Sequence, residues 1–197
     1  KALAYNYRGA IYDSLKNYQQ AIADANQAIE LKHNNLEWTY ENRGISRYKI
    51  GDFQGGLDDL NQAIAINPNY YRAYNSRGFV KSAIGNHQEA IMDFNRSIAI
   101  NPNYIDAYIN RGESRVKLGD FIGAITFGRA SLNADFSQII TLNPPSLENY
   151  YYNRGICHLS RKDYLNAIKD FTQTININPN YFTAYYNRGC CHFELKD

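Results

Sequence analysis

The chain has 197 residues, of which 44% are hydrophobic and 20% are charged, and this composition is typical of an ordinary globular protein. Its formal net charge is only +2. Because nucleic acids and anionic membrane surfaces bind clustered lysine and arginine, this balance argues against both classes of partner. The sequence contains no run of about 18 apolar residues, so it predicts no membrane-spanning segment.

The first residues indicate whether the sequence is part of a longer chain, and the cysteines indicate its redox compartment. Residues 1–5 already match the interior of a helix that recurs later, so we expect this sequence to start within a longer chain. Three cysteines are too few to build a disulfide framework, and two of them are adjacent. We therefore expect a reducing, cytoplasmic compartment.

An Arg-Gly pair recurs six times and divides the chain into similar units. The steps between successive arginines are 35, 34, 34, 43 and 34 residues, and a tyrosine stands three residues before each arginine. Further along each unit come a turn with Asp or Asn, an apolar pair such as Ala-Ile, an aspartate and usually Asn-Pro. The pairs are Arg8-Gly9, Arg43-Gly44, Arg77-Gly78, Arg111-Gly112, Arg154-Gly155 and Arg188-Gly189.

Residues 71–104 show why each unit is predicted to be a pair of helices. A first helix is expected from Tyr71 to about Ile84, and Gly85-Asn86 ends it, since glycine suits the left-handed position and asparagine caps the next helix. Asn101-Pro102 stops the second helix, because proline cannot continue its hydrogen bonds. The second helix carries one stripe at helical spacing, namely Ala90, Ile91, Phe94, Ser97 and Ile98.

The same pattern along the chain predicts five hairpins followed by one further first helix. Because no hairpin can bury its apolar face alone, neighbours are expected to stack. The open apolar ends of such a stack favour self-association. The predicted units are residues 2–35, 37–70, 71–104, 105–145, 148–181 and 182–197.

A period of 34 residues, with an aromatic residue at position 4, Gly at 8, Ala near 20 and Pro at 32, resembles the tetratricopeptide repeat (TPR). The resemblance covers essentially the whole chain. It implies an all-α right-handed superhelix, or solenoid, of about 5.5 stacked antiparallel hairpins in one domain of residues 1–197, with first helices lining a concave groove. The Arg-Gly and Asn-Pro-Asn version resembles repeats of bacterial, especially cyanobacterial, multi-repeat proteins.

Two sets of charged residues depart from the family pattern. Position 7, usually leucine, is arginine in all six first helices, and position 23 is aspartate in all five second helices. In an antiparallel hairpin these positions lie near the same level, so we expect a ladder of partly buried ion pairs, within or between adjacent repeats. The alternative is that both sets reach solvent. The ladder residues are Arg43, Arg77, Arg111, Arg154, Arg188, Asp24, Asp59, Asp93, Asp135 and Asp170.

The fourth unit contains additional residues, at about 126–133 within its second helix. Apolar residues keep helical spacing through this segment, which favours a lengthened helix, kinked near Gly128, over a looped-out segment.

No catalytic constellation is found, so the chain is predicted not to be an enzyme and to need no cofactor. His158 and His192 each follow a cysteine at the same repeat position, which suggests a metal site. Equivalent positions in adjacent repeats lie about 10 Å apart, however, whereas zinc ligands lie about 2.0–2.3 Å from one ion. We therefore predict no metal site and a packing role for these residues.

The family resemblance places positions 2, 5, 9, 12 and 13 of each first helix on the concave wall. These residues are mainly apolar and aromatic, with scattered charges of both signs, which suits a docked peptide. The chain is therefore predicted to be a protein-binding or peptide-binding scaffold. The alternatives are a structural self-assembly element, the regulatory arm of a larger protein, or wall residues that merely pack against their neighbours. The candidate wall residues are Trp38, Glu41, Ile45, Tyr48, Lys49, Arg72, Asn75, Phe79, Ile109, Glu113, Val116, Lys117, Tyr152, Ile156 and Leu159.

Overall fold

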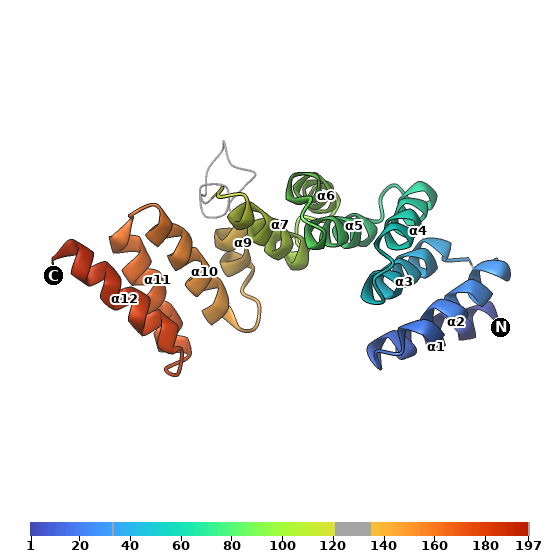
Figure 1. Ribbon diagram of the computed structural model, residues 1–197, viewed down its shortest axis with the longest axis horizontal. Coiled ribbons are helices and arrows are strands. Elements are labelled where there is room, and N and C mark those ends of the chain that lie inside the picture. Colours follow the sequence, from blue (N-terminus) through green and yellow to red (C-terminus); the bar gives the residue numbers. More distant parts are fainter. Residues whose placement is uncertain (33, 121–134, 197) are drawn as a thin grey trace. The chain divides into compact units, whose positions relative to one another are not determined.

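The computed structural model describes residues 1–32, 34–120 and 135–196. These residues form eleven α-helices and contain no β-strand, and consecutive helices pair into antiparallel hairpins (Figure 1). The predicted all-α fold of stacked hairpins is confirmed. The helices are α1 (Ala2–Ser14), α2 (Tyr18–Glu30), α3 (Leu36–Lys49), α4 (Phe53–Ile66), α5 (Tyr71–Ala83), α6 (His87–Ile100), α7 (Ile105–Lys117), α9 (Asp135–Leu142), α10 (Leu147–Ser160), α11 (Tyr164–Ile177) and α12 (Phe182–Leu195).

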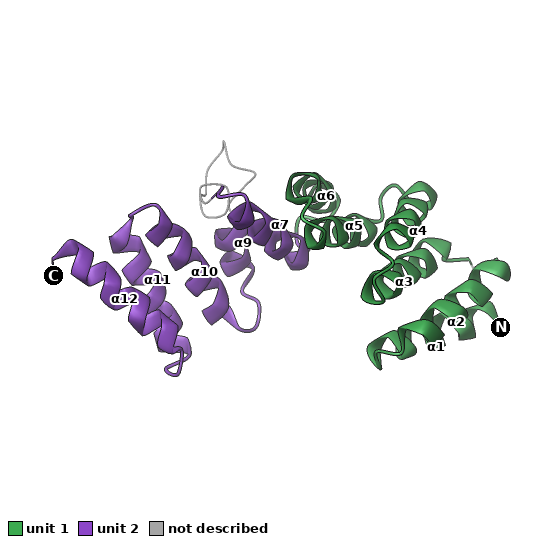
Figure 2. Ribbon diagram, viewed as in Figure 1, with its two compact units in different colours: residues 1–102 green, residues 103–197 purple. Residues whose placement is uncertain are grey.

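Contacts between helices divide the chain into two compact units (Figure 2). Unit 1 comprises residues 1–102 with helices α1 to α6, and unit 2 comprises residues 103–197 with helices α7 and α9 to α12. In unit 1, α3 packs against its own second helix α4 and also against α1, α2 and α5 of the neighbouring hairpins. In unit 2, α7 packs against α9, α10 against α9 and α11, and α11 against α12. That residues 1–197 act as a single domain remains a prediction.

Short turns with defined backbone conformations separate the helices. Gly51 has a φ of +88°, which glycine adopts without steric cost after a helix. The next residue, Asp52, caps α4, since its carboxylate accepts a hydrogen bond of 2.9 Å from the backbone N–H of Gly55. Between hairpins, Asn67 and Asn101 have extended backbone immediately before a proline, which cannot continue the helix.

The core of a hairpin lies where the glycine of the first helix faces the second helix. A Cβ atom added at Gly78 would lie 2.7 Å from the ring of Phe94, and one added at Gly155 would lie 2.8 Å from the ring of Phe171. Both rings are fully buried. The ring therefore fills the space that a side chain on the first helix would need, which explains why glycine recurs there.

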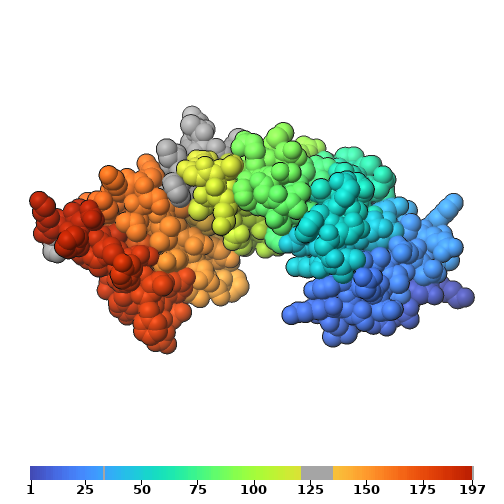
Figure 3. Space-filling model, viewed as in Figure 1, coloured from blue at the N-terminus to red at the C-terminus, as the bar shows by residue number. Residues whose placement is uncertain are grey.

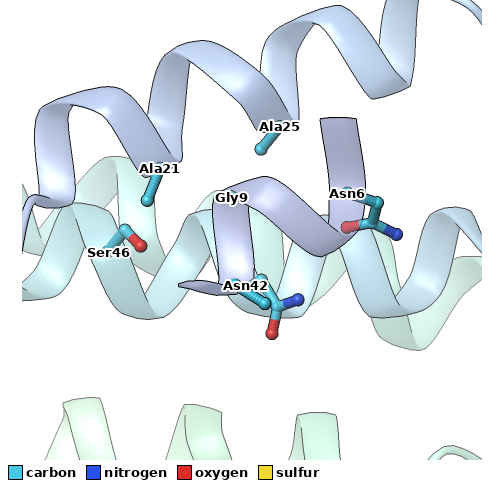
Figure 4. Close-up of a pocket in the computed structure, with 7 residues that line it drawn as sticks. Asn6, Gly9, Ala21, Ala25, Asn42 and Ser46 are labelled. Carbon is cyan, nitrogen blue, oxygen red and sulfur yellow. The ribbon is translucent and has the colours of Figure 1, made fainter. Parts of the chain in front are cut away.

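The first hairpin has a cavity at the corresponding place (Figure 4). Ala25 stands where α4 carries Leu60 and α6 carries Phe94, so the methyl group leaves space that a larger side chain fills in the next two hairpins. Within the described part of the chain, the buried Nδ2 atoms of Asn6 and Asn42 have no hydrogen-bond partner. The cavity is lined by Asn6, Gly9, Ala10, Ala21, Ala25, Asn42 and Ser46.

The prediction of a lengthened second helix in the fourth unit, kinked near Gly128, lies outside the described residues. The described part of that unit consists of α7 and α9. Downstream, Pro144 is buried and Ser146 adopts a positive φ of 65° before α10 begins at Leu147. The fifth first helix therefore begins within one residue of the predicted unit boundary at residue 148.

Candidate functional site

Five position-7 arginines, Arg8 among them, pair with the aspartates within hairpins, whereas the described residues give the predicted ladder residue Arg188 no such ion pair. In each of five hairpins the Nε and Nη2 atoms of arginine face the two carboxylate oxygens of aspartate, or one of them in the fourth hairpin. The aspartate side chains are at most 6% exposed. The closest N–O distances are 2.7 Å for Arg8–Asp24, 2.5 Å for Arg43–Asp59, 2.5 Å for Arg77–Asp93, 2.6 Å for Arg111–Asp135 and 2.7 Å for Arg154–Asp170.

The third guanidinium nitrogen of several of these arginines reaches the preceding hairpin. Nη1 of Arg43 donates to Oδ1 of Asn26 at 2.7 Å, and Nη1 of Arg77 donates to Oδ1 of Asn61 at 2.8 Å. In unit 2, the corresponding bonds of 3.3 Å join Arg154 to Ser137 and Arg188 to Thr172. Arg43, Arg77 and Arg154 thus each connect two hairpins, with the ion pair inside one and a neutral hydrogen bond to the other.

Sequence reasoning missed a second basic residue beside four of the aspartates. It stands at position 11, one helical turn after the ladder arginine, and its recurrence in the sequence could have revealed it. The carboxylates of Asp59, Asp93 and Asp135 thus lie between two cations, which compensate a buried carboxylate better than a single pair does. The distances are 2.9 Å for Arg47–Asp59, 3.0 Å for Lys81–Asp93, 2.6 Å for Arg115–Asp135 and 3.8 Å for His158–Asp170.

The fourth hairpin holds the most deeply buried of these groups. The side chains of Arg111, Arg115 and Asp135 are 2%, 5% and 0% exposed. Burial raises the pKa of Asp135 to about 6, although both arginines oppose the rise. Arg111 and Asp135 are 24 residues apart, whereas the partners in the other hairpins are 16 apart. Eight of the additional residues of the fourth unit therefore lie between two residues that still pair.

In unit 1, α3 and α5 place three candidate wall residues together. The rings of Tyr48 and Phe79 meet edge to face with centroids 5.4 Å apart. The ammonium group of Lys49 lies 5.4 Å from the Tyr48 centroid and 6.0 Å from that of Phe79. Phe79 is 36% exposed and Lys49 is exposed. We call Tyr48, Lys49 and Phe79 the aromatic–lysine patch; it combines apolar surface with an adjacent positive charge.

The other candidate residues of unit 1 differ in exposure. Trp38 packs edge to face on Tyr7 of α1, with centroids 5.5 Å apart, and both Trp38 and Ile45 are half-buried. Arg72 is exposed. Asn75, however, is buried and therefore presents little surface to a ligand.

Glu41 was also placed on the wall by its repeat position, but it is buried at 5% exposure. Its carboxylate accepts hydrogen bonds from the Tyr70 hydroxyl and, at 3.0 Å, from Ser76 Oγ, and it lies 3.7 Å from Nε of Arg72. Burial and the adjacent carboxylate raise the pKa of Tyr70. Glu41 thus joins neighbouring hairpins and is not available to bind a ligand.

In unit 2, the candidate residues of α7 keep an accessible edge. Ile109 and Val116 are half-buried, whereas Glu113 and Lys117 are exposed and carry opposite charges. Partial desolvation by neighbouring groups raises the pKa of Glu113, and nearby Lys117 opposes the rise.

The candidate residues of α10 have a packing role as well. Tyr152, Ile156 and Leu159 are half-buried against the core cluster formed by residues of α11 and α12. The Tyr152 ring lies 4.8 Å from that of Tyr181, and its hydroxyl accepts a hydrogen bond of 3.1 Å from Nδ2 of Asn187. These contacts favour the alternative in which wall positions pack against the next hairpin.

The histidine and cysteine side chains are the groups that bear on metal and thiol chemistry. No group of three or more potential metal ligands occurs among the described residues. Nδ1 of His158 lies 3.0 Å from Asp163. Burial raises the pKa of the Cys157 thiol to about 12, which disfavours the reactive thiolate. Within the described ranges, no helix is long and apolar enough to cross a membrane.

Comparisons with known proteins place these hairpins in a wider context. A family model described as tetratricopeptide repeat matches residues 2–35 and 149–181, and a second model of the same description matches residues 71–104. Together the matched segments cover slightly more than half of the chain. No curated protein matches the sequence.

Solved structures with the same fold share little sequence identity with this chain. The crystal structure of YrrB, described as a TPR protein with an unusual peptide-binding site, has a TM-score of 0.73 at 17% identity, covering 96% of this chain and 92% of that one. A tetratricopeptide repeat protein from Parabacteroides merdae has a TM-score of 0.77 at 17% identity, with coverages of 99% and 73%. MamA from Desulfovibrio magneticus has a TM-score of 0.75 at 17% identity, with coverages of 91% and 96%. At such identities, these matches show a shared fold.

Proposed function

The chain belongs to the tetratricopeptide repeat family, and we propose that it is a polypeptide-binding scaffold whose principal contact surface in unit 1 is the aromatic–lysine patch. Proteins of this family generally act as interaction scaffolds and not as enzymes, and they generally bind proteins or peptides. What this chain contributes is a particular surface on a common fold, so the proposal depends on the side chains of that surface.

The observation that carries the proposal is the exposure of Phe79 within a fixed aromatic arrangement. Its ring is held by an edge-to-face contact with Tyr48 across neighbouring hairpins, yet more than a third of the residue remains exposed. Aromatic side chains that are already held in place lose little conformational entropy on binding, which is why they often dominate interface energetics.

The charge beside the rings indicates the chemistry of the ligand. Lys49 places its ammonium group about equally near Tyr48 and Phe79. A peptide that lays an apolar side chain on Phe79 and a carboxylate beside Lys49 would satisfy both groups at once. We therefore propose a peptide segment in which an acidic residue adjoins an apolar one. YrrB, which shares the fold, is described as having an unusual peptide-binding site, and this supports a peptide as the ligand.

In unit 2, the proposed contact surface is the edge of α7. Ile109 and Val116 supply apolar area there, and Glu113 and Lys117 supply charges of both signs. Tyr152, Ile156 and Leu159 contribute through their exposed parts, because they also pack against the following helices. This surface is less apolar than the patch of unit 1, so we expect it to add selectivity more than affinity.

The test is a selection of peptides from a random library displayed on phage, with the intact chain as bait. Enriched peptides are then measured by fluorescence polarisation against the Phe79→Glu variant and against Met92→Glu, a control in the same unit. Met92 is 66% exposed on the second helix α6, so its substitution introduces the same charge away from the patch.

We expect Phe79→Glu to weaken binding at least about tenfold, which corresponds to about 1.4 kcal/mol, and Met92→Glu to leave it unchanged. Peptides that bind both variants as tightly as the unmodified chain would remove the patch from the proposal. A selection that enriches no peptide would contradict it as well.

A further inference from the structure

A second cation of unit 1 is held in place by the buried carboxylate of Glu41. Arg72 is the second residue of α5, and its Nε atom lies 3.7 Å from Oε2 of Glu41. The same carboxylate accepts hydrogen bonds from the Tyr70 hydroxyl and from Ser76 Oγ. Because a buried carboxylate is costly without a compensating cation, this ion pair holds the guanidinium group of Arg72 at one place on the wall.

Arg72 is nevertheless accessible from solvent. Its side chain is 52% exposed, whereas that of Glu41 is 6% exposed. A guanidinium group carries five N–H donors, so it can bind a carboxylate of its own protein and one of a ligand at the same time. Glu37 in the first turn of α3 adds a negative charge near Tyr70, so an acidic ligand group needs direct contact with Arg72 to bind here. An arginine that is already held loses less conformational entropy when it makes such a contact.

Arg72 lies on the same face of α5 as the exposed ring of the aromatic–lysine patch. Arg72 and Phe79 are seven residues apart, which is close to two helical turns, or about 10 Å along the helix axis. Helix α3, which carries Tyr48 and Lys49, packs beside α5 in the cyan and green part of Figure 3. The Phe79 ring therefore has one cation beside it and a second cation two turns away on its own helix.

The spacing of the two cations predicts a pattern in the ligand. Helices α3 and α5 are both first helices and run in the same direction, so Lys49 at the end of α3 and Arg72 at the start of α5 lie toward opposite ends of this wall. An extended peptide advances about 3.3 Å per residue, so about three residues span the distance from Phe79 to Arg72. The Lys49 ammonium group lies 6.0 Å from the Phe79 centroid, within reach of the residue directly adjacent to the one on the ring.

We propose that unit 1 recognises an extended peptide with the pattern acidic–x–x–apolar–acidic, in which x is any residue and the pattern is read in either chain direction. The apolar side chain lies on Phe79, the acidic residue beside it meets Lys49, and the other acidic residue meets Arg72. The inference rests on the proposed peptide-binding function. It extends that function by one anchor for the ligand, Arg72, and by one positioning residue, Glu41.

The experiment compares three synthetic peptide pools on the immobilised intact chain. Every pool fixes a phenylalanine next to a glutamate, varies the remaining positions and contains the pattern in both chain directions. On the other side of the phenylalanine, the first pool has a glutamate three residues away, the second has a glutamine there, and the third has the glutamate only two residues away. Captured peptides are quantified by mass spectrometry as ratios between pools on the same protein, because such ratios do not depend on how much of the protein is folded.

We expect the intact chain to capture the first pool at least about fivefold better than either of the others. Arg72→Gln should lower the ratio of the first pool to the second to about one. Glu41→Gln should keep the preference for glutamate over glutamine but lose the preference for the three-residue spacing, because Arg72 keeps its charge and is no longer held. The control Arg96→Gln should behave as the intact chain, since Arg96 is exposed on the second helix α6 and its loss removes the same charge away from the wall.

The variant Phe79→Glu separates this inference from the function on which it rests. If Phe79→Glu lowers capture of the first pool but the intact chain takes the first and second pools equally, the role of Arg72 is overturned and the patch stands. A preference that Arg72→Gln leaves unchanged has the same meaning. If Phe79→Glu captures the first pool as well as the intact chain does, or if the intact chain captures no pool, the proposed function falls together with this inference.

Discussion

Removal of Asp93 tests whether the ion pairs stabilise the stack of hairpins. Its side chain is 6% exposed. The carboxylate accepts hydrogen bonds from Nε of Arg77 at 2.9 Å and from Nη2 of Arg77 at 2.5 Å, and it lies 3.0 Å from Nζ of Lys81. Breaking a buried pair costs about 3–5 kcal/mol, whereas breaking a surface pair costs less than about 1 kcal/mol. Because the side chains of Arg77 and Lys81 are 20% and 19% exposed, water compensates them in part. We therefore expect Asp93→Ala to lower the free energy of unfolding by about 2–4 kcal/mol.

The measurement is urea unfolding followed by circular dichroism, with Asp58→Ala as the matched control. Asp58 is exposed on α4 and accepts one hydrogen bond from Gln54, so its removal changes the net charge equally without exposing buried cations. Replacing Arg77 and Lys81 by methionine in the Asp93→Ala background should recover much of the loss, since no unpaired charge then remains. A change for Asp93→Ala within about 0.5 kcal/mol of the control would refute a structural role for the pair.

Two further predictions follow from the first hairpin and from the cysteines. Ala25→Leu should raise the free energy of unfolding by about 1 kcal/mol in the same assay. Leucine occupies this position in the next hairpin, and here it would fill the cavity beneath Gly9. A loss of stability would show that the cavity cannot accept the side chain. Iodoacetamide should modify Cys190 first in the folded chain, as followed by peptide mass spectrometry, because Cys157 and Cys191 are fully buried and burial raises the pKa of both thiols. Equal rates at the three cysteines would contradict this packing.

The helical hairpins could be predicted because their signals are local. The first helix of the third unit was expected from Tyr71 to about Ile84, and α5 spans Tyr71–Ala83. Glycine and proline act on the backbone of their own turn, and apolar spacing requires only a few neighbouring residues. The recurrence of the pattern then predicted that the hairpins stack, because each hairpin leaves apolar surface that only its neighbours can cover.

The candidate wall was less predictable, because a repeat position does not determine what covers a side chain. Glu41 and Asn75 share position 5, which the family resemblance assigns to the wall, yet both are buried. The burial of Glu41 depends on Tyr70, which precedes α5, and on Ser76 within α5. Tyr152 at the same position packs on Tyr181 and binds Asn187. Such partners differ from hairpin to hairpin, so no single position could indicate them.

The sequence by itself determined that this chain folds into repeated helix pairs, since the spacing of glycine, proline and apolar residues acts over distances of one or two helical turns. Only the tertiary structure decided how the charged residues are used. The sequence left open whether the aspartates pair within or between repeats, and the structure places each ion pair within one hairpin while Nη1 of Arg43 and Arg77 reaches the preceding one. That choice depends on the distance between helices in three dimensions, because a charge pairs with the nearest buried partner whatever its separation along the chain.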